Sequence, residues 1–155
     1  MAEKNEDKYK QFSNKLLDWY DIRRRILPWR AAPGEISNPY FVLLSEIMLQ
    51  QTVVVTVIPY FLRFVKKWPT ITQLAKADFN ERASLWAGLV YYRRAKNLHE
   101  SAKLISTKYN GLIPNNKEVL LSLPGVGEYT ATAIMAIAFD KKENVVDGNI
   151  ERVFS

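Results

Sequence analysis

Glu46 is the carboxylate with the clearest chemical potential, because it stands inside the otherwise almost wholly apolar segment FVLLSEIML. Burial of a carboxylate is costly unless the group is paired or functional. Desolvation raises the pKa of such a group, so it can hold a proton near neutral pH, deliver it to a leaving group and accept one back. A structural partner such as a buried arginine is the alternative, so the local sequence indicates either a general acid or an ion pair.

A second carboxylate, Asp147, lies near the end of the run LPGVGEYTATAIMAIAFDKKENVVDGN at residues 123–149. Pro124 ends any helix before it, while Gly125 and Gly127 permit backbone conformations closed to other residues and the close approach of another molecule. Exposed amides at the start of the following helix can cradle a phosphate. The alternatives are an ordinary helix-to-helix turn at LPGVG and a simple turn or helix cap at DGN.

We expect a helical scaffold to position these groups. Apolar residues recur at helical spacing, and no convincing strand alternation appears. A loop is expected at residues 27–39, which are rich in Pro, Gly, Ser and Asn. We expect helices from Tyr9 to Arg23 and at about residues 40–51, 53–67, 72–76, 81–87, 91–109, 117–122 and 128–139, with Thr70, Asn80 and Asn116 as caps. The fold class is therefore all-α.

Composition favours a polyanionic partner. The chain has 155 residues, 48% of them hydrophobic, which suffices for one sizeable core and a small second lobe. The formal charge of +6 attracts polyanions. Basic residues cluster near expected helix ends and loops, where they can meet phosphates or form solvated faces, at Arg23 to Arg25, Lys66 and Lys67, Arg93, Arg94 and Lys96, and Lys141 and Lys142.

The absence of cysteine excludes a disulfide framework and a thiolate-bound metal cluster built from these residues. The single His99 makes no metal site alone, so we expect neither a metal nor a cofactor. No signal-like stretch opens the sequence, and no apolar run approaches the length needed to cross a membrane. An intracellular, cytoplasmic protein is expected, associated with the nucleoid if bacterial.

Several motifs in order resemble the MutY-type adenine DNA glycosylases of the helix-hairpin-helix superfamily, whose signature is such a hairpin followed by an essential aspartate. Besides the hairpin and Asp147, they are LPWR from Leu27, SEIMLQQT from Ser45, VIPYFLRF from Val57 and WAGLVYYRRAKNLH from Trp86. The resemblance runs from about residue 16 to residue 152. It implies an all-α helix-hairpin-helix DNA glycosylase fold, with a six-helix core and an incomplete second lobe.

The domain organisation follows from this resemblance. Residues 1–27 are expected to form an N-terminal helix of the incomplete second lobe, residues 28–141 the core with the hairpin, and residues 142–155 the start of a C-terminal lobe. The family continues into helices with four cysteines on an iron-sulfur cluster and a domain that reads 8-oxoguanine. None of these ligands is present here, so we expect a truncated chain with no cofactor of its own.

The implied activity is hydrolysis of the N-glycosidic bond of adenine mispaired with 8-oxoguanine or guanine in double-stranded DNA, a step of base excision repair. Glu46 matches the position that protonates adenine at N7 and then assists the water. The reaction builds positive charge on the sugar, which a fixed anion stabilises. Asp147 matches that anion, and Asn149 matches the residue that helps to position it.

Tyr129 matches the hairpin position that carries a lysine in endonuclease III-like relatives. There the lysine amine attacks the sugar, forms a Schiff base and cuts the strand. A tyrosine cannot form that imine. The resemblance therefore implies a monofunctional glycosylase that leaves an abasic site.

An enzyme reaches a base inside a duplex by rotating it out and filling the gap. In the family, residues at matching positions wedge into DNA (Gln51, Tyr91), line the adenine pocket (Trp29, Arg30, Leu49) or form the DNA-binding hairpin (Gly125, Val126, Gly127). Tyr, Trp and Leu are also common core residues, which is the alternative for each. Val90 departs from the pattern, because the family usually has a second glycine there.

Two other functions stay open: a non-catalytic DNA-binding remnant of the family, and a glycosylase for another base. The sequence does not fix the oligomeric state. The first helix carries an apolar stripe that includes Phe12, Leu16 and Trp19. Without the family's further helices, this stripe would be exposed, refolded against the body, or covered by a second copy of the chain.

Overall fold

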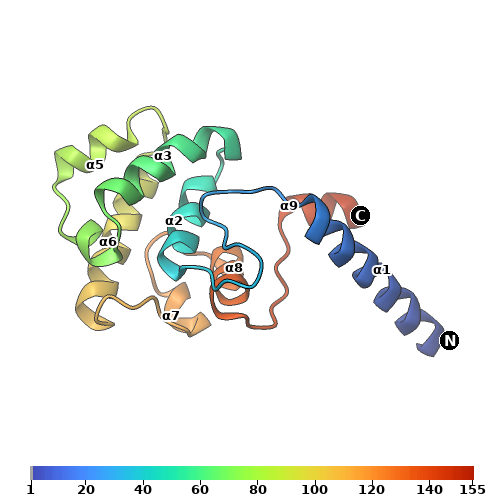
Figure 1. Ribbon diagram of the computed structural model, residues 1–155. Helices are drawn as coiled ribbons and strands as arrows, with labels where there is room; N and C mark the ends of the chain where they lie inside the picture. The colour runs from blue at the N-terminus through green and yellow to red at the C-terminus, as the bar shows by residue number, and fades with distance from the viewer. Residues whose placement is uncertain (1) are drawn as a thin grey trace.

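The computed structural model describes the backbone of residues 2–155 and the side chains from residue 6 onward. Met1 lies outside the described residues. Nine helices and no strand occur in this part of the chain (Figure 1). They are α1 (Ala2–Arg23), α2 (Pro39–Leu49), α3 (Val54–Lys67), α4 (Ile71–Ala75), α5 (Phe79–Trp86), α6 (Arg93–Lys108), α7 (Lys117–Leu121), α8 (Glu128–Phe139) and α9 (Gly148–Phe154). The predicted all-α class is confirmed.

Helix α2 lies at the centre of the body, in contact with α3, α6 and α8 (Figure 1). It is apolar on nearly every face, as expected for a helix enclosed by others, and seven of its eleven residues are buried. Its start is fixed by Asn38, whose Oδ1 accepts hydrogen bonds from the backbone N–H of Tyr40 at 2.9 Å and of Phe41 at 3.4 Å. Pro39 fits the first turn, which needs no N–H donor.

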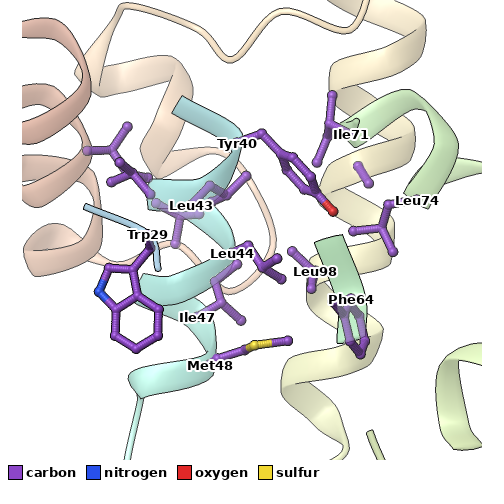
Figure 2. Packing of buried hydrophobic residues seen from close by; sticks show 14 of the residues in the cluster. Trp29, Tyr40, Leu43, Leu44, Ile47, Met48, Phe64, Ile71, Leu74 and Leu98 are labelled. Atoms are coloured by element: carbon purple, nitrogen blue, oxygen red, sulfur yellow. The ribbon is translucent and has the colours of Figure 1, made fainter. Parts of the chain in front are cut away.

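Side chains of α2 join those of α3, α4 and α6 in one apolar cluster, in which Leu44 and Leu98 are among the labelled residues (Figure 2). The loop before α2 is attached to this cluster by Trp29, whose ring meets Phe61 edge to face with the centroids 5.3 Å apart. Phe61 makes a second edge-to-face contact with Phe41 at 5.5 Å. Such pairs add about 0.5–1.5 kcal/mol beyond the burial of their area. The core therefore fixes both α2 and the loop that precedes it.

The hairpin between α7 and α8 is held from α6. Gly125 has a φ of 80°, and a Cβ added there would lie 2.9 Å from the Cβ of Asn97, so this position requires glycine. The Oγ of Ser101 donates a hydrogen bond to the carbonyl of Pro124 at 2.7 Å. Gly127 differs from the prediction, because its φ of −93° is open to any residue. Only the first hairpin glycine is needed for its backbone conformation.

Several helix ends differ from the prediction, and α1 begins at Ala2 rather than at Tyr9. Two of the differences lie at the ends of α2 and α6. Helix α2 ends at Leu49 rather than at residue 51, and α6 begins at Arg93 rather than at residue 91. Gln51 and Tyr91 therefore lie in loops, with φ values of 57° and 49°. The prediction that Arg94 meets phosphates is wrong, because its side chain is buried and donates hydrogen bonds to backbone carbonyls. These bonds draw the two helix ends together.

The expected caps are confirmed at Thr70 and Asn116. The cap at Asn80 is wrong: the carboxylate of Asp78 accepts hydrogen bonds from the N–H groups of Asn80 at 2.8 Å and Glu81 at 3.4 Å. A carboxylate caps as well as an amide and also interacts favourably with the helix dipole. Between residues 28 and 141 the structure has the seven helices expected from the spacing, two of which, α4 and α7, are only five residues long.

Helix α1 extends away from the body beside α9, so both ends of the described chain lie on one side (Figure 1). Phe12 meets Phe154 edge to face, with the ring centroids 6.2 Å apart. The apolar stripe is not refolded against the body, since Phe12, Leu16 and Trp19 are all more than half exposed in the single chain. Cover by a second copy stays a prediction. The assignment of both terminal segments to one second lobe stays a prediction. In the described part of the chain, no helix has the length and apolar character needed to span a membrane.

Val90 has a φ of 60° in the loop before α6, although a β-branched residue rarely adopts this conformation. We predict that Val90→Gly exceeds Val90→Ala in free energy of unfolding by about 1 kcal/mol, because Cβ is strained at positive φ. The matched control is Leu62 inside α3, where alanine should exceed glycine by about 1 kcal/mol. Urea denaturation measures all four variants. The same order at both positions would contradict the strain at Val90.

Candidate active site

One face of α2 lines a cleft with a volume of about 910 Å³. The residues on this face are Val42, Ser45, Glu46, Leu49 and Gln50. They follow the spacing of a single helical stripe, three or four residues apart. The volume lies in the range of about 300–1,000 Å³ typical of ligand pockets. The sequence of α2 therefore places its one acid at the cleft while the rest of the helix is enclosed.

The other walls of the cleft come from three separate segments. The loop before α2 contributes Trp29 and Arg30, and the first turn of α8 contributes Tyr129. Asp147 and Asn149 come from the start of α9. Four predicted catalytic residues and three predicted pocket residues thus line one cleft, although they are far apart in the sequence.

Glu46 has an unusually high proton affinity. Burial and, to a smaller extent, the negative charge of Asp147 together raise its pKa from 4.5 to about 7. The structural alternative of an arginine partner is not observed in the described residues, since Arg94 bonds to carbonyls instead. Glu46 can therefore hold a proton at neutral pH and release it in a reaction.

The pKa of Asp147 is shifted in the opposite direction, downward, because its carboxylate caps α9. Its Oδ1 accepts hydrogen bonds from the N–H of Ile150 at 2.8 Å and of Asn149 at 3.0 Å, and its Oδ2 accepts one from the Asn149 side chain at 3.0 Å. The bond from Ile150 and the bond from the Asn149 amide lower the pKa of Asp147. The hydrogen bonds that cap α9 therefore also keep the Asp147 carboxylate ionised at the cleft.

Tyr129 lies in the first turn of α8 and lines the same cleft. Burial and, to a smaller extent, the charges of Glu46 and Asp147 together raise its pKa to about 12. Its hydroxyl therefore keeps its proton and can donate a hydrogen bond in the cleft that Glu46 and Asp147 also line.

The predicted pocket residues have different environments. Trp29 is 8% exposed, so much of its ring belongs to the core, whereas Arg30 is exposed and donates a hydrogen bond to the carbonyl of Arg25 at 3.2 Å. Leu49 is half-buried at the cleft. The prediction missed Gln50, whose Nε2 donates to the carbonyl of Gly125 at 3.0 Å and so ties the hairpin to α2. Its position four residues after Glu46 is the signal that could have found it.

The remaining predicted DNA contacts lie outside the cleft. Gln51 and Tyr91 are exposed in the loops next to Arg94. In the hairpin, Val126 is buried at 6% exposure. Gly127 is exposed and precedes the first turn of α8, where no side chain caps the amides. The structure thus separates a cleft that could do chemistry from surfaces that could contact a second molecule.

The helical body, the hairpin and the two acids of different proton affinity define a helix-hairpin-helix protein with an acid-base cleft. The sequence profile described as HhH-GPD superfamily base excision DNA repair protein matches residues 44–155. The chain belongs to this family. The predicted helix-hairpin-helix DNA glycosylase fold is confirmed, since the chain superposes on a thermostable thymine-DNA glycosylase with a TM-score of 0.85 and 33% identity, over 97% of this chain and 68% of that one.

Relatives that carry the name adenine DNA glycosylase include proteins from Rattus norvegicus and Mycolicibacterium smegmatis. The protein from Rattus norvegicus is 48% identical over 147 residues, which cover 92% of this chain and 28% of that protein. The protein from Mycolicibacterium smegmatis is 44% identical over 138 residues, which cover 89% of this chain and 46% of that protein. The chain thus spans less than half the length of these relatives.

An iron-sulfur cluster of the kind the resemblance implies does not fit the residues present. Such clusters are held by cysteine thiolates, and the 155 residues contain none. Among the described residues, no group of three or more His, Asp or Glu side chains could hold a metal ion. The chemistry of the cleft is therefore derived from the side chains alone.

The high pKa of Glu46 makes the stability of the fold depend on pH. The folded state binds this proton more tightly than the unfolded state, so the free energy of unfolding falls as pH rises from about 4.5 to about 7. We predict that Glu46→Gln is more stable than the wild type by about 3 kcal/mol at high pH, where the wild type buries a charge, and equally stable at low pH.

Urea denaturation between pH 4 and pH 8 measures this difference. The matched control is Glu118→Gln, an exposed glutamate of α7, which should leave the pH dependence of the wild type unchanged. A constant difference between Glu46→Gln and the wild type across the pH range would contradict the raised pKa.

Proposed function

We propose that this chain carries the catalytic core of a monofunctional adenine DNA glycosylase. Its substrate would be double-stranded DNA that contains adenine mispaired with 8-oxoguanine or guanine. The observation that carries the proposal is one cleft with two acids whose pKa values are driven apart, Glu46 upward to about 7 and Asp147 downward. Such a pair supports acid and anion roles in one reaction. The name of the relatives at 48% and 44% identity supports adenine as the base.

In the proposed reaction the Glu46 carboxyl donates its proton to N7 of the flipped adenine. The bond between the sugar and the base then breaks, and its electron pair leaves with the base. Asp147, ionised by its cap, stabilises the positive charge left on the sugar. A water attacks this sugar carbon and gives its proton to the Glu46 carboxylate, which restores the acid. Asn149 holds Asp147 through its side-chain amide.

DNA binding would combine the hairpin with basic residues at the cleft. The first turn of α8 follows the exposed Gly127, and its amides suit a phosphate. Glu128 in this turn would oppose an anion, but it is paired with Lys117 at 2.6 Å. Arg24 and Arg25 line the cleft, which supports a role in DNA binding for this part of the basic cluster at Arg23 to Arg25. The net charge of +6 favours the same partner.

A second candidate base is thymine, because the similar solved structure with a TM-score of 0.85 is named a thymine-DNA glycosylase. Its identity of 33% is lower than the 48% of the rat adenine DNA glycosylase. Duplexes with adenine opposite 8-oxoguanine, adenine opposite guanine, and thymine opposite guanine distinguish the two in one assay.

The first test of activity is single-turnover base release from these duplexes. We predict that adenine is released, that the rate falls as pH rises through about 7 because Glu46 loses its proton, and that Glu46→Gln lowers the rate by about 10²–10⁴-fold. Glu81→Gln on α5, an exposed glutamate paired with Lys67, is the control and should keep the rate of the wild type. Binding of the duplexes without release of any base would favour a non-catalytic remnant.

Tyr129 provides a second test, of reaction type. A tyrosine forms no Schiff base, so we predict that borohydride traps no covalent protein-DNA adduct and that the strand at the abasic site stays uncut. Denaturing gel electrophoresis measures both products. An adduct that disappears in Tyr129→Phe would overturn the monofunctional assignment, whereas an adduct that persists would point to another nucleophile.

A further inference from the structure

Two loops beside the cleft contain three residues with strained backbones. Gln51 follows α2 with a φ of 57°, and Val90 and Tyr91 precede α6 with φ values of 60° and 49°. Positive φ costs a residue other than glycine roughly 1–2 kcal/mol. Such strain persists only where surrounding contacts over-determine it. The side chains of Gln51 and Tyr91, the two proposed DNA wedges, are both exposed.

Arg94 makes the contacts that join these two loops. Its Nη1 donates hydrogen bonds to the carbonyls of Met48 at 2.6 Å and Gln50 at 2.6 Å, at the C-terminal end of α2. Its Nη2 donates to the carbonyls of Leu89 at 3.0 Å and Val90 at 3.3 Å. One guanidinium therefore binds the residue before Gln51 and the residue before Tyr91 at the same time.

The environment of Arg94 suits a residue that joins two loops by hydrogen bonds rather than one that forms an ion pair. The side chain is 7% exposed, and in the described residues no carboxylate pairs with it. The negative end of the α2 dipole compensates its charge instead. The guanidinium lies 5.5 Å from the ring centroid of Trp86 and 5.5 Å from that of Tyr91. The contact with Tyr91 orients that side chain as well as its backbone.

We propose that Arg94 is a positioning residue that holds Gln51 and Tyr91 at a fixed separation, so that both enter the DNA stack together when the target base leaves it. This inference rests on the proposed function, because it assigns these two side chains to the opened duplex. A fixed pair avoids the entropy of ordering two loops during binding. Only a planar fork with several donors can serve both loops, so lysine cannot replace arginine here.

The closing experiment has a structural arm that does not depend on activity. Arg94→Lys keeps the charge but loses the fork, and removal of such charge-assisted hydrogen bonds should speed hydrogen exchange of the amides at residues 50–52 and 89–92 by about tenfold or more. The matched control is Arg82→Lys, since Arg82 donates to the carbonyl of Ala77 at 3.3 Å and lies 5.7 Å from the Phe79 ring, away from both loops. It should leave these amides unchanged. Equal exchange in the wild type and Arg94→Lys would overturn the proposal.

The functional arm compares base release from a duplex with release from the same adenine in an unpaired bubble, which needs no wedge. Arg94→Lys should lower the duplex rate by about a hundredfold and the bubble rate far less, since misplacement by about 1 Å has effects of this size. Combination with Tyr91→Ala should bring no further loss. Equal losses on both substrates, or additive losses, would mean that Arg94 only supports the fold and would overturn the proposal.

A pair of exposed substitutions tests the same idea where Arg94→Lys fails to fold. Gln51→Ala and Tyr91→Ala should be strongly non-additive on the duplex while Arg94 is intact, because the two side chains enter the DNA stack as one unit. Additive effects would overturn the proposal. If the wild type releases no base from either substrate, the proposed function fails, and the hydrogen-exchange arm still decides whether Arg94 fixes the two loops.

Discussion

The cost of burying one carboxylate in an apolar helix is the constraint on which the site depends. Helix α2 must be enclosed on almost every side to form the core, yet it carries Glu46 on the one face that meets the cleft. Partial burial there raises the pKa of Glu46 to about 7. Full exposure would remove the shift, and complete enclosure would remove access to a substrate. The walls around α2 therefore set the chemistry as much as the acid itself does.

Asp147 shows how a local structural device can serve a site. The free amides at the start of α9 lower the pKa of this carboxylate, while Glu46 across the cleft keeps its proton. Capping requires an acceptor at the helix start, and a cationic transition state requires a fixed anion. One side chain can meet both requirements, because the hydrogen bonds that cap α9 also favour the ionised carboxylate at the cleft. The cap, one of the two interpretations that the sequence left open, is observed, and it leaves room for the catalytic anion, which stays a prediction.

Much of the fold could be predicted from local patterns, because apolar periodicity and capping residues act over a few positions. The hairpin, the loop before α2 and the acid in its apolar segment are all of this kind. The role of Arg94 could not be predicted, since it joins nearby carbonyls to carbonyls of residues more than forty positions away. Carbonyls carry no signature in a sequence, and a basic residue beside Arg93 and Lys96 resembles an exposed cluster. The cap at Asn80 failed for a smaller reason, as Asp78 competes for the same amides.

The residue at position 129 decides more than the choice of nucleophile. Tyr129 is close enough to Glu46 for the charge of that carboxylate to raise the pKa of the hydroxyl. An ammonium group in the same place would act in the reverse direction, because a positive charge favours the ionised carboxylate and lowers its pKa. Glu46 would then lose its proton at neutral pH and could not protonate a base. A neutral hydroxyl at position 129 and a protonated acid at position 46 are therefore linked requirements, and the cleft is consistent in satisfying both.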